Sequence, residues 1–108
     1  MALYEMRTYT LHIGKTREAT KHYQELGFPA LKKGGYDKYL VGYFLADTGT
    51  INQLLHIWKF EDDADRRAFW ARLLADKDFM EGFMPSFRPL IMSMEVKLLT
   101  PAPWGHHP

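Results

Sequence analysis

The chain has 108 residues, enough for one domain with a single hydrophobic core. Its 14 basic and 13 acidic residues give a formal net charge of +1, so charge gives no reason to expect a nucleic-acid partner. Cysteine is absent, which excludes disulfides, thiolate metal sites and cysteine nucleophiles, and no apolar run is long enough to span a membrane.

The first half of the chain predicts a strand, a helix and a second strand. Side chains alternate in character along Leu3–His12, which is typical of a strand. Lys15–Leu26 carries apolar residues at helical spacing, and we expect Gly27 and Pro29 to interrupt this helix. The apolar segment Tyr39–Ala46 predicts the second strand.

The second half predicts a hairpin, another helical region and a last strand. The turn at Asp47–Thr50 leads into Ile51–Phe60, which is rich in β-branched and aromatic residues and lacks Gly and Pro. Glu61–Ala75 has the spacing of a helix, and Asp76–Met84 predicts a further short one. Leu90–Leu99 alternates again and predicts the fourth strand.

The order β-α-β-β-α-β predicts an α+β, ferredoxin-like fold. In this fold a four-stranded antiparallel sheet carries both helices on one face. We expect one domain over residues 1–100 and an irregular tail over 101–108, where three prolines fall in eight residues. Without an N-terminal signal peptide or a membrane span in the sequence, we expect a cytoplasmic protein.

Strand alternation separates an apolar set of side chains from a mixed ionic and aromatic set. We expect the helices to cover the apolar set, which is Met6, Leu55, Ile57, Met92, Met94 and Val96. We expect the other face to carry the mixed set, which is Glu5, Arg7, Tyr9, Asn52, His56, Trp58, Ser93 and Glu95. Neither open water nor a dry core suits both Trp58 and the Glu5–Arg7 charges. We therefore expect a homodimer whose two sheets enclose a partly polar cavity.

Several short segments together resemble the NIPSNAP family. They are Tyr4–Thr10, Gly14-Lys15, Gly42-Tyr43-Phe44, Asn52-Gln53 with His56 and Trp58, Asp65-Arg66, and Arg88–Ile91. The resemblance covers Leu3 to Leu99 and implies membership of the dimeric α/β-barrel superfamily. That superfamily includes cofactor-free antibiotic-biosynthesis monooxygenases, haem-degrading enzymes, and small dehalogenating or decarboxylating enzymes. The NIPSNAP branch itself supplies no settled chemistry.

His56 and Trp58 form the sharpest candidate pair. A histidine in a half-dry cavity is suited to act as a general base or as a ligand of haem iron. The alternative is a structural histidine that is hydrogen-bonded to Glu5 or Tyr9. The sequence leaves both interpretations open.

The remaining candidates would hold a ligand. Arg7 beside Glu5 is suited to an acidic substrate, or to a structural ion pair inside the cavity. Tyr9, Tyr43 and Trp58 would stack on a flat aromatic molecule, or simply fill space. Asn52 would help Arg7 to stabilise an oxyanion. Asp65-Arg66-Arg67 is expected on the solvent side of its helix.

Three functions are consistent with these residues. The first is a cofactor-free oxygenase-like or isomerase-like enzyme acting on a small hydrophobic or aromatic molecule, with His56 as its base. The second is a non-catalytic dimeric binding or scaffold module. The third is a haem-binding or haem-degrading protein. We expect no metal, because the histidines lack ligand spacing, and no other cofactor.

Overall fold

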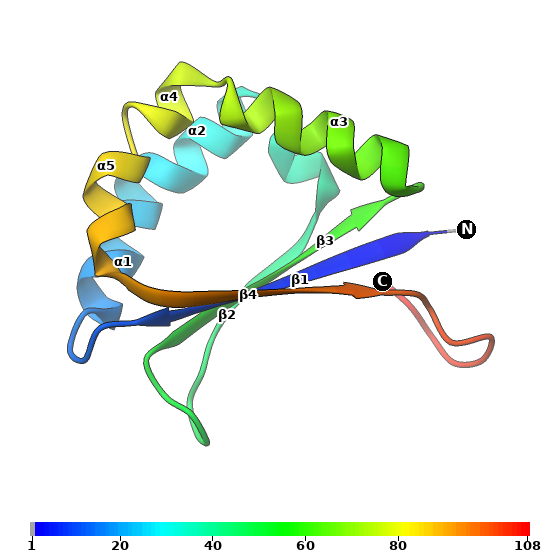
Figure 1. The fold of residues 1–108 in the computed structure, drawn as a ribbon, viewed down its shortest axis with the longest axis horizontal. Coiled ribbons are helices and arrows are strands. Elements are labelled where there is room, and N and C mark those ends of the chain that lie inside the picture. The colour runs from blue at the N-terminus through cyan, green and yellow to red at the C-terminus, as the bar shows by residue number, and fades with distance from the viewer. Residues whose placement is uncertain (1) are drawn as a thin grey trace.

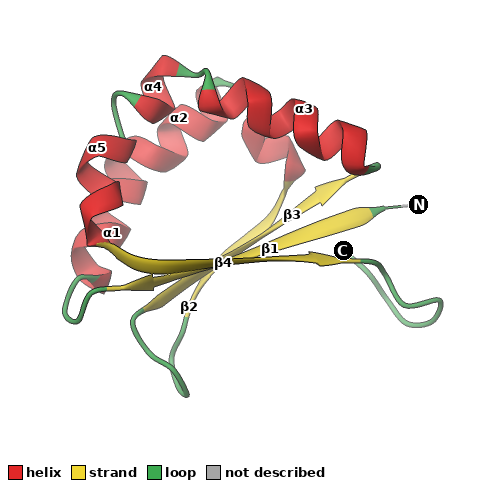
Figure 2. Ribbon diagram, in the orientation of Figure 1, coloured by secondary structure: helices red, strands yellow, loops and turns green. Residues whose placement is uncertain are grey.

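The computed structural model describes residues 2–108 as a four-stranded antiparallel sheet beneath a layer of helices (Figures 1 and 2). The strand order in the sheet is β2-β3-β1-β4, so the predicted ferredoxin-like fold is confirmed. Met1, which the predicted domain range 1–100 includes, lies outside the described residues. The strands are β1 (Leu3–Leu11), β2 (Leu40–Leu45), β3 (Gln53–Phe60) and β4 (Ile91–Leu99).

The first helical arm runs without a break through the predicted interruption. It consists of α1 (Thr16–His22), the π-helical turn η1 (Tyr23–Gly27) and α2 (Phe28–Lys33). Pro29 lies in the first turn of α2, where a missing N–H is tolerated, and the wide η1 turn precedes it. A Cβ atom on Gly27 would lie 2.8 Å from the ring of Phe83, so glycine permits this helix to approach its neighbour closely.

The second helical arm starts at a capped helix and ends in short turns. Asp62 caps α3 (Asp63–Leu74) by accepting a hydrogen bond from the backbone N–H of Asp65 at 2.8 Å. The predicted helix over Asp76–Met84 is shorter than expected, and a second short helix begins at Met84 and continues past Pro85. The remaining elements are α4 (Lys77–Met80), α5 (Met84–Phe87) and the 3₁₀ turns η2 (Tyr36–Tyr39) and η3 (Arg88–Leu90).

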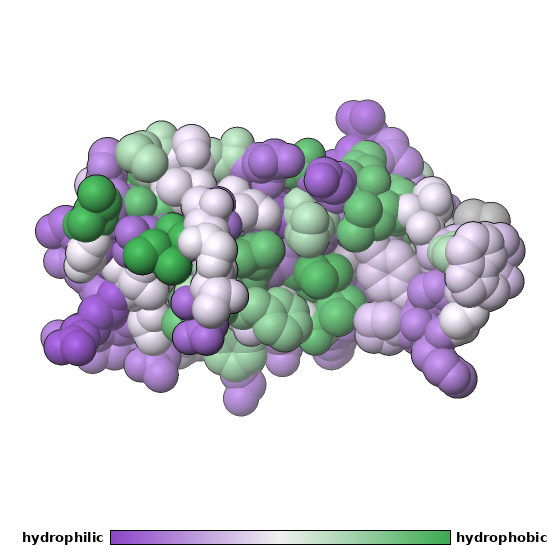
Figure 3. Space-filling model, turned by 90° about the horizontal axis from the view of Figure 1, so that it is seen from below, coloured by the Kyte–Doolittle hydropathy of each residue, from purple (hydrophilic) through white to green (hydrophobic). Residues whose placement is uncertain are grey.

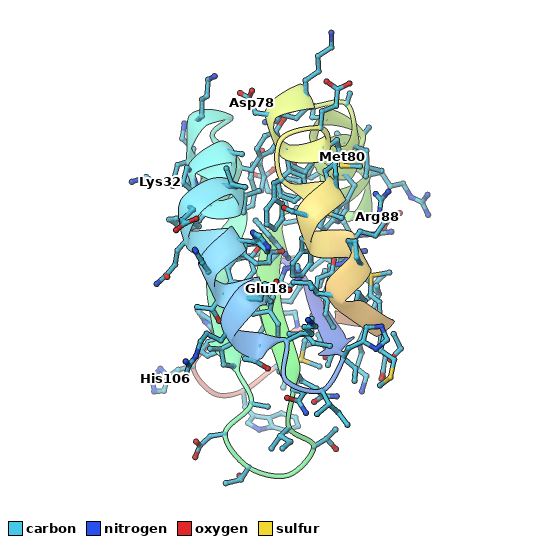
Figure 4. The ribbon with its side chains drawn as sticks, turned by 90° about the vertical axis from the view of Figure 1, so that its left-hand side faces the viewer. Glu18, Lys32, Asp78, Met80, Arg88 and His106 are labelled. Carbon is cyan, nitrogen blue, oxygen red and sulfur yellow. The ribbon has the colours of Figure 1, made fainter. Side chains whose placement is uncertain are left out.

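The two arms lie side by side as a roof over the sheet. Figure 4 shows Glu18 and Lys32 on the α1–α2 arm, and Met80 and Arg88 on the α4–α5 arm beside it. The arms pack on each other through α1 with α5 and through α2 with α4. Figure 1 shows the arch that these helices make on one side of the sheet, while the opposite side carries no helix.

The helices cover the ionic and aromatic face, so the predicted assignment of faces is wrong. The ring of Trp58 lies 5.0 Å from that of Phe69 on α3. The guanidinium of Arg7 lies 4.2 Å from the centre of the Trp70 ring, also on α3. Trp58 and Arg7 therefore point beneath the helices. Met6, Leu55 and Ile57, which were expected there, are half-buried on the other face.

The roof itself explains this reversal. Its inward side chains are large rings, including Phe69, Trp70 and Phe87, and aromatic partners fill the space opposite them best. The charges of Glu5 and Arg7 are tolerated there because they have partners, whereas an unpaired buried charge costs several kcal/mol, of the order of 3–5.

For the edge strand β4 the predicted alternation is correct. Val96 pairs with Arg7 and Met94 pairs with Tyr9, so both lie on the helix side of the sheet. Both remain about half exposed, because β4 is the edge strand farthest from β2. Glu95 pairs with Thr8 on the opposite face, as expected.

The helix-free face carries an apolar patch at its centre (Figure 3). Met6 pairs with Ile57, and Leu55 pairs with Phe44, which places these side chains on one surface. We call these four residues the open-face patch. Polar side chains surround it, including Thr8, Thr10, Glu95 and Lys97. Residues 100–108 form no helix or strand, and the Tyr4 hydroxyl donates a hydrogen bond to the carbonyl oxygen of Pro108.

Candidate functional site

A cavity of about 820 Å³ lies between the sheet and the helical roof. The predicted cavity between two sheets of a dimer is therefore replaced by a cavity within one chain. Five of the six proposed site residues line it, all from β1 and β3. Its main lining residues are Glu5, Arg7, Tyr9, His56 and Trp58 from the strands, and Tyr23, Arg66 and Trp70 from the helices.

A chain of alternating charges runs from the surface into this cavity. Glu5, which is fully buried, accepts hydrogen bonds from Arg7 at 3.2 Å and from Arg66 at 2.9 Å, one on each oxygen. Arg66 also bonds Asp63 at 2.9 Å, and Asp63 bonds Arg67 at 2.7 Å. The network Arg67–Asp63–Arg66–Glu5–Arg7 thus contains three guanidinium groups and two carboxylates. It carries one excess positive charge.

The sequence analysis missed Tyr23, Trp70 and Arg66 as site residues, and it also misplaced Arg66. We expected it on the solvent side of its helix, but its side chain is only 18% exposed and reaches Glu5. Arg66 and Trp70 are four residues apart, so they share one face of α3, and both line the cavity. This four-residue spacing is the sequence feature that could have predicted Arg66 as a site residue, because an Arg and a Trp on one helix face suit a partly polar site.

His56 is held as a neutral ring between two tyrosines. Its ring stacks on Tyr9 at 5.2 Å and on Tyr43 at 4.7 Å. The Trp58 indole N–H donates a hydrogen bond to His56 Nδ1 at 2.6 Å. Burial, with a smaller contribution from the Arg7 guanidinium, lowers the pKa of His56 from 6.5 to about 3. The ring is therefore neutral at physiological pH.

This arrangement decides what His56 can do chemically. A neutral imidazole has one donor and one acceptor nitrogen. Because Nδ1 accepts from Trp58, Nε2 carries the proton and is a donor. The partner is Trp58 rather than the Glu5 or Tyr9 that we considered. No lone pair is left free for general-base catalysis or for binding haem iron.

The tyrosines around His56 are protonated. Burial raises the pKa of Tyr9, although the nearby Arg7 partly offsets this effect. Burial also raises the pKa of Tyr43 and raises that of Tyr23 well above its usual value. The three phenols therefore contribute flat apolar surface and neutral hydroxyl groups to the cavity.

Asn52 lies outside the cavity lining. It precedes β3 in a left-handed conformation with φ +62°, and its side-chain oxygen accepts a hydrogen bond from the Thr16 hydroxyl at 3.4 Å. Its backbone oxygen accepts from the N–H of Leu11. Asn52 therefore shapes the hairpin connection, at the end of the sheet away from Glu5.

Two kinds of feature are absent from residues 2–108. Within this range, no three His, Asp or Glu side chains are grouped so that they could hold a metal ion. None of the helices described in this range is both long and apolar enough to cross a bilayer.

Comparison with known proteins assigns this chain to a protein family. The profile of the family described as NIPSNAP matches residues 4–106. The chain belongs to the NIPSNAP family. It is 29% identical over 102 residues to protein NipSnap homolog 3B of Mus musculus and, equally, to protein NipSnap homolog 3A of Homo sapiens. These alignments cover 94% of this chain but only 40% of each curated relative.

Solved NIPSNAP structures share the fold closely. A NIPSNAP family protein of unknown function from Agrobacterium tumefaciens is 36% identical, with a TM-score of 0.88 over 96% of this chain and 91% of that one. An uncharacterized NIPSNAP domain protein from Burkholderia xenovorans is 33% identical, with a TM-score of 0.84 over 97% and 99%.

A more distant neighbour shares the fold alone. It is a putative antibiotic biosynthesis monooxygenase from Chloroflexus aurantiacus, 13% identical with a TM-score of 0.61, covering 99% of this chain and 98% of that one. This places the NIPSNAP fold near the monooxygenase group without transferring its chemistry.

Proposed function

We propose that this NIPSNAP protein binds a small hydrophobic or aromatic molecule in the cavity beneath its helices. The observation that carries the proposal is the cavity itself, about 820 Å³ and lined by Tyr9, Tyr23, Tyr43, Trp58 and Trp70. A space of this size with aromatic walls and a few polar groups is typical of a small-molecule site.

The geometry supports binding more strongly than acid–base catalysis. Both oxygens of Glu5 are occupied by arginines, and the lone pair of His56 is occupied by Trp58. The surrounding tyrosines are protonated. A non-catalytic binding module is therefore the function that these groups favour.

If the bound molecule is also transformed, His56 is the candidate catalytic residue. It would act as a hydrogen-bond donor and not as the general base that the sequence suggested. A neutral imidazole that donates through Nε2 stabilises negative charge developing on a substrate oxygen, and Arg7 adds a positive charge beside it. This would assist cofactor-free oxygenase-like or isomerase-like chemistry that passes through an enolate.

Binding is tested with 2-naphthamide, a neutral flat aromatic probe, by isothermal titration calorimetry. Ala71→Trp places a large side chain in the cavity lining and should weaken binding roughly tenfold. Ala68→Trp, three residues earlier on α3 and outside the lining, is the matched control and should bind like the wild type. Absence of saturable wild-type binding of both this probe and its carboxylate analogue 2-naphthoate, or equal weakening in both variants, would contradict the proposal.

We further propose that the open-face patch forms a homodimer with a second copy of this chain. Met6, Phe44, Leu55 and Ile57 leave apolar surface on a sheet face that carries no helix, and such patches mark interaction sites. Leu55→Glu should give a monomer by sedimentation velocity. Ile13→Glu, at an 89% exposed position outside the patch, should leave the dimer intact. A monomeric wild type would end this proposal without affecting the cavity.

A further inference from the structure

The cavity contains buried hydrogen-bond donors without partners. Among residues 2–108, the buried side-chain nitrogens that lack a partner are Arg7 Nε, His56 Nε2 and Trp70 Nε1. All three are N–H donors, and no side-chain oxygen in the described range is left in this state. Buried polar groups are normally satisfied, so three such donors require an explanation.

The three donors belong to neighbouring side chains of one site. Arg7 and His56 are direct cross-strand partners in the β1–β3 register. The Arg7 guanidinium also lies over the Trp70 ring at 4.2 Å. All three residues line the cavity. An acceptor that satisfied these donors would lie between β1, β3 and α3.

Charge points to the same kind of group. The network Arg67–Asp63–Arg66–Glu5–Arg7 has one more cation than anions, and Arg7 is its innermost member. Arg67, at the outer end, has a side chain that is 73% exposed, so water stabilises its charge. The Arg7 side chain is only 16% exposed, so its charge depends more on neighbouring groups. An anion beside Arg7 would balance the network.

We propose that the molecule bound in this cavity is an aromatic carboxylate, with its carboxylate held by Arg7, His56 and Trp70. This rests on the proposed binding function and adds the chemical class of the ligand. A carboxylate offers two oxygens with about four acceptor sites, enough for three donors, whereas a single carbonyl oxygen offers two. The attached ring would lie among the aromatic side chains that line the cavity, where stacking is favourable.

The test compares 2-naphthoate with 2-naphthamide, which has the same ring and nearly the same shape but no charge. Titration calorimetry on the full chain at pH 7.5 should show naphthoate binding at least tenfold more tightly. Trp70→Phe retains a ring on α3 but removes one donor. It should weaken naphthoate about threefold more than it weakens naphthamide. Trp104→Phe, in the exposed tail, is the matched control and should change neither affinity.

A second variant probes the charge. Arg7→Met removes the guanidinium and should reduce the preference for naphthoate to less than threefold. Because this change also takes one partner from Glu5, circular dichroism must confirm that the variant folds. If Arg7→Met does not fold, Trp70→Phe alone tests the proposal. The His56 Nε2–H resonance should move further on addition of naphthoate than on addition of naphthamide.

Each other outcome has a definite meaning. Equal binding of the two probes to the wild type overturns the carboxylate proposal and leaves the binding function standing. Binding of neither probe overturns both. A preference for naphthoate that survives in Trp70→Phe and in folded Arg7→Met shows that the carboxylate is bound elsewhere, which overturns the assignment of these residues.

Discussion

The two faces of the sheet differ in an unexpected direction. The face beneath the helices holds a carboxylate, an arginine and a histidine among aromatic rings, with Glu5 fully buried and His56 only 2% exposed. The helix-free face holds half-buried aliphatic and threonine side chains together with the exposed side chains of Phe44, Glu95 and Lys97. Charge is therefore no reliable sign of the solvent side when each charge has a partner on a neighbouring element. The face beneath the helices is the one whose side chains are suited to binding or chemistry.

The largest expected effect comes from removing the buried carboxylate. Glu5→Gln leaves Arg7 and Arg66 without their shared anion, and we expect a loss of about 3 kcal/mol in the free energy of unfolding. Glu95→Gln, on the opposite face and exposed, is the matched control and should stay within about 0.5 kcal/mol of the wild type. Urea denaturation measures both. Similar losses in the two variants would mean that the faces are not distinguished by burial.

The next effect is the pH dependence that His56 introduces. Its pKa is about 3 in the folded chain and 6.5 as a reference value, so below pH 6.5 the unfolded chain takes up a proton that the folded chain does not. The contribution of His56 to the free energy of unfolding is fully present above pH 6.5 and falls as the pH drops toward 3. The loss between pH 7.5 and pH 5 should be about 2 kcal/mol.

The variant His56→Gln should lack this part of the acid dependence when unfolding by urea is compared at the two pH values. His12→Gln, at an exposed position, should retain it. If His56→Gln loses stability on acidification as steeply as the wild type, then His56 is not buried as a neutral ring.

A smaller effect is expected from the hydrogen bond that orients His56. Trp58→Phe removes the N–H that His56 Nδ1 accepts and leaves a small void, and it should cost about 2 kcal/mol or less. Trp104→Phe, in the tail, should be neutral in the same thermal or urea unfolding experiment. An unchanged ¹⁵N chemical shift of His56 Nδ1 in Trp58→Phe would argue against this hydrogen bond.

The fold followed from sequence patterns because its strands alternate clearly. Leu3–His12 and Leu90–Leu99 were predicted within one residue at each end of β1 and β4. The break predicted at Pro29 is absent, because a wide turn lets the helix continue through it. Such a turn depends on packing between the arms, as at Gly27 against Phe83, which a single segment does not encode.

The candidate site was predicted in its residues but not in its position. Glu5, Arg7, Tyr9, His56 and Trp58 do share one face and line one cavity, because strand alternation groups them. Alternation does not say which face the helices cover. That is decided by rings such as Phe69 and by the reach of Arg66 from α3, both distant in sequence from β1. Asn52 was misplaced because its left-handed conformation precedes β3 and breaks the alternation.

The most direct test of the central claim is a double-mutant cycle between Glu5 on β1 and Arg66 on α3. Urea unfolding of the wild type, Glu5→Gln, Arg66→Gln and the double variant gives the coupling free energy. With the carboxylate beneath the helices, the coupling should be about 2 kcal/mol, within the usual range for residues that share an ion pair. Losses that add to within about 0.5 kcal/mol would show that Glu5 does not meet Arg66, and would contradict the placement of the ionic face beneath the helices.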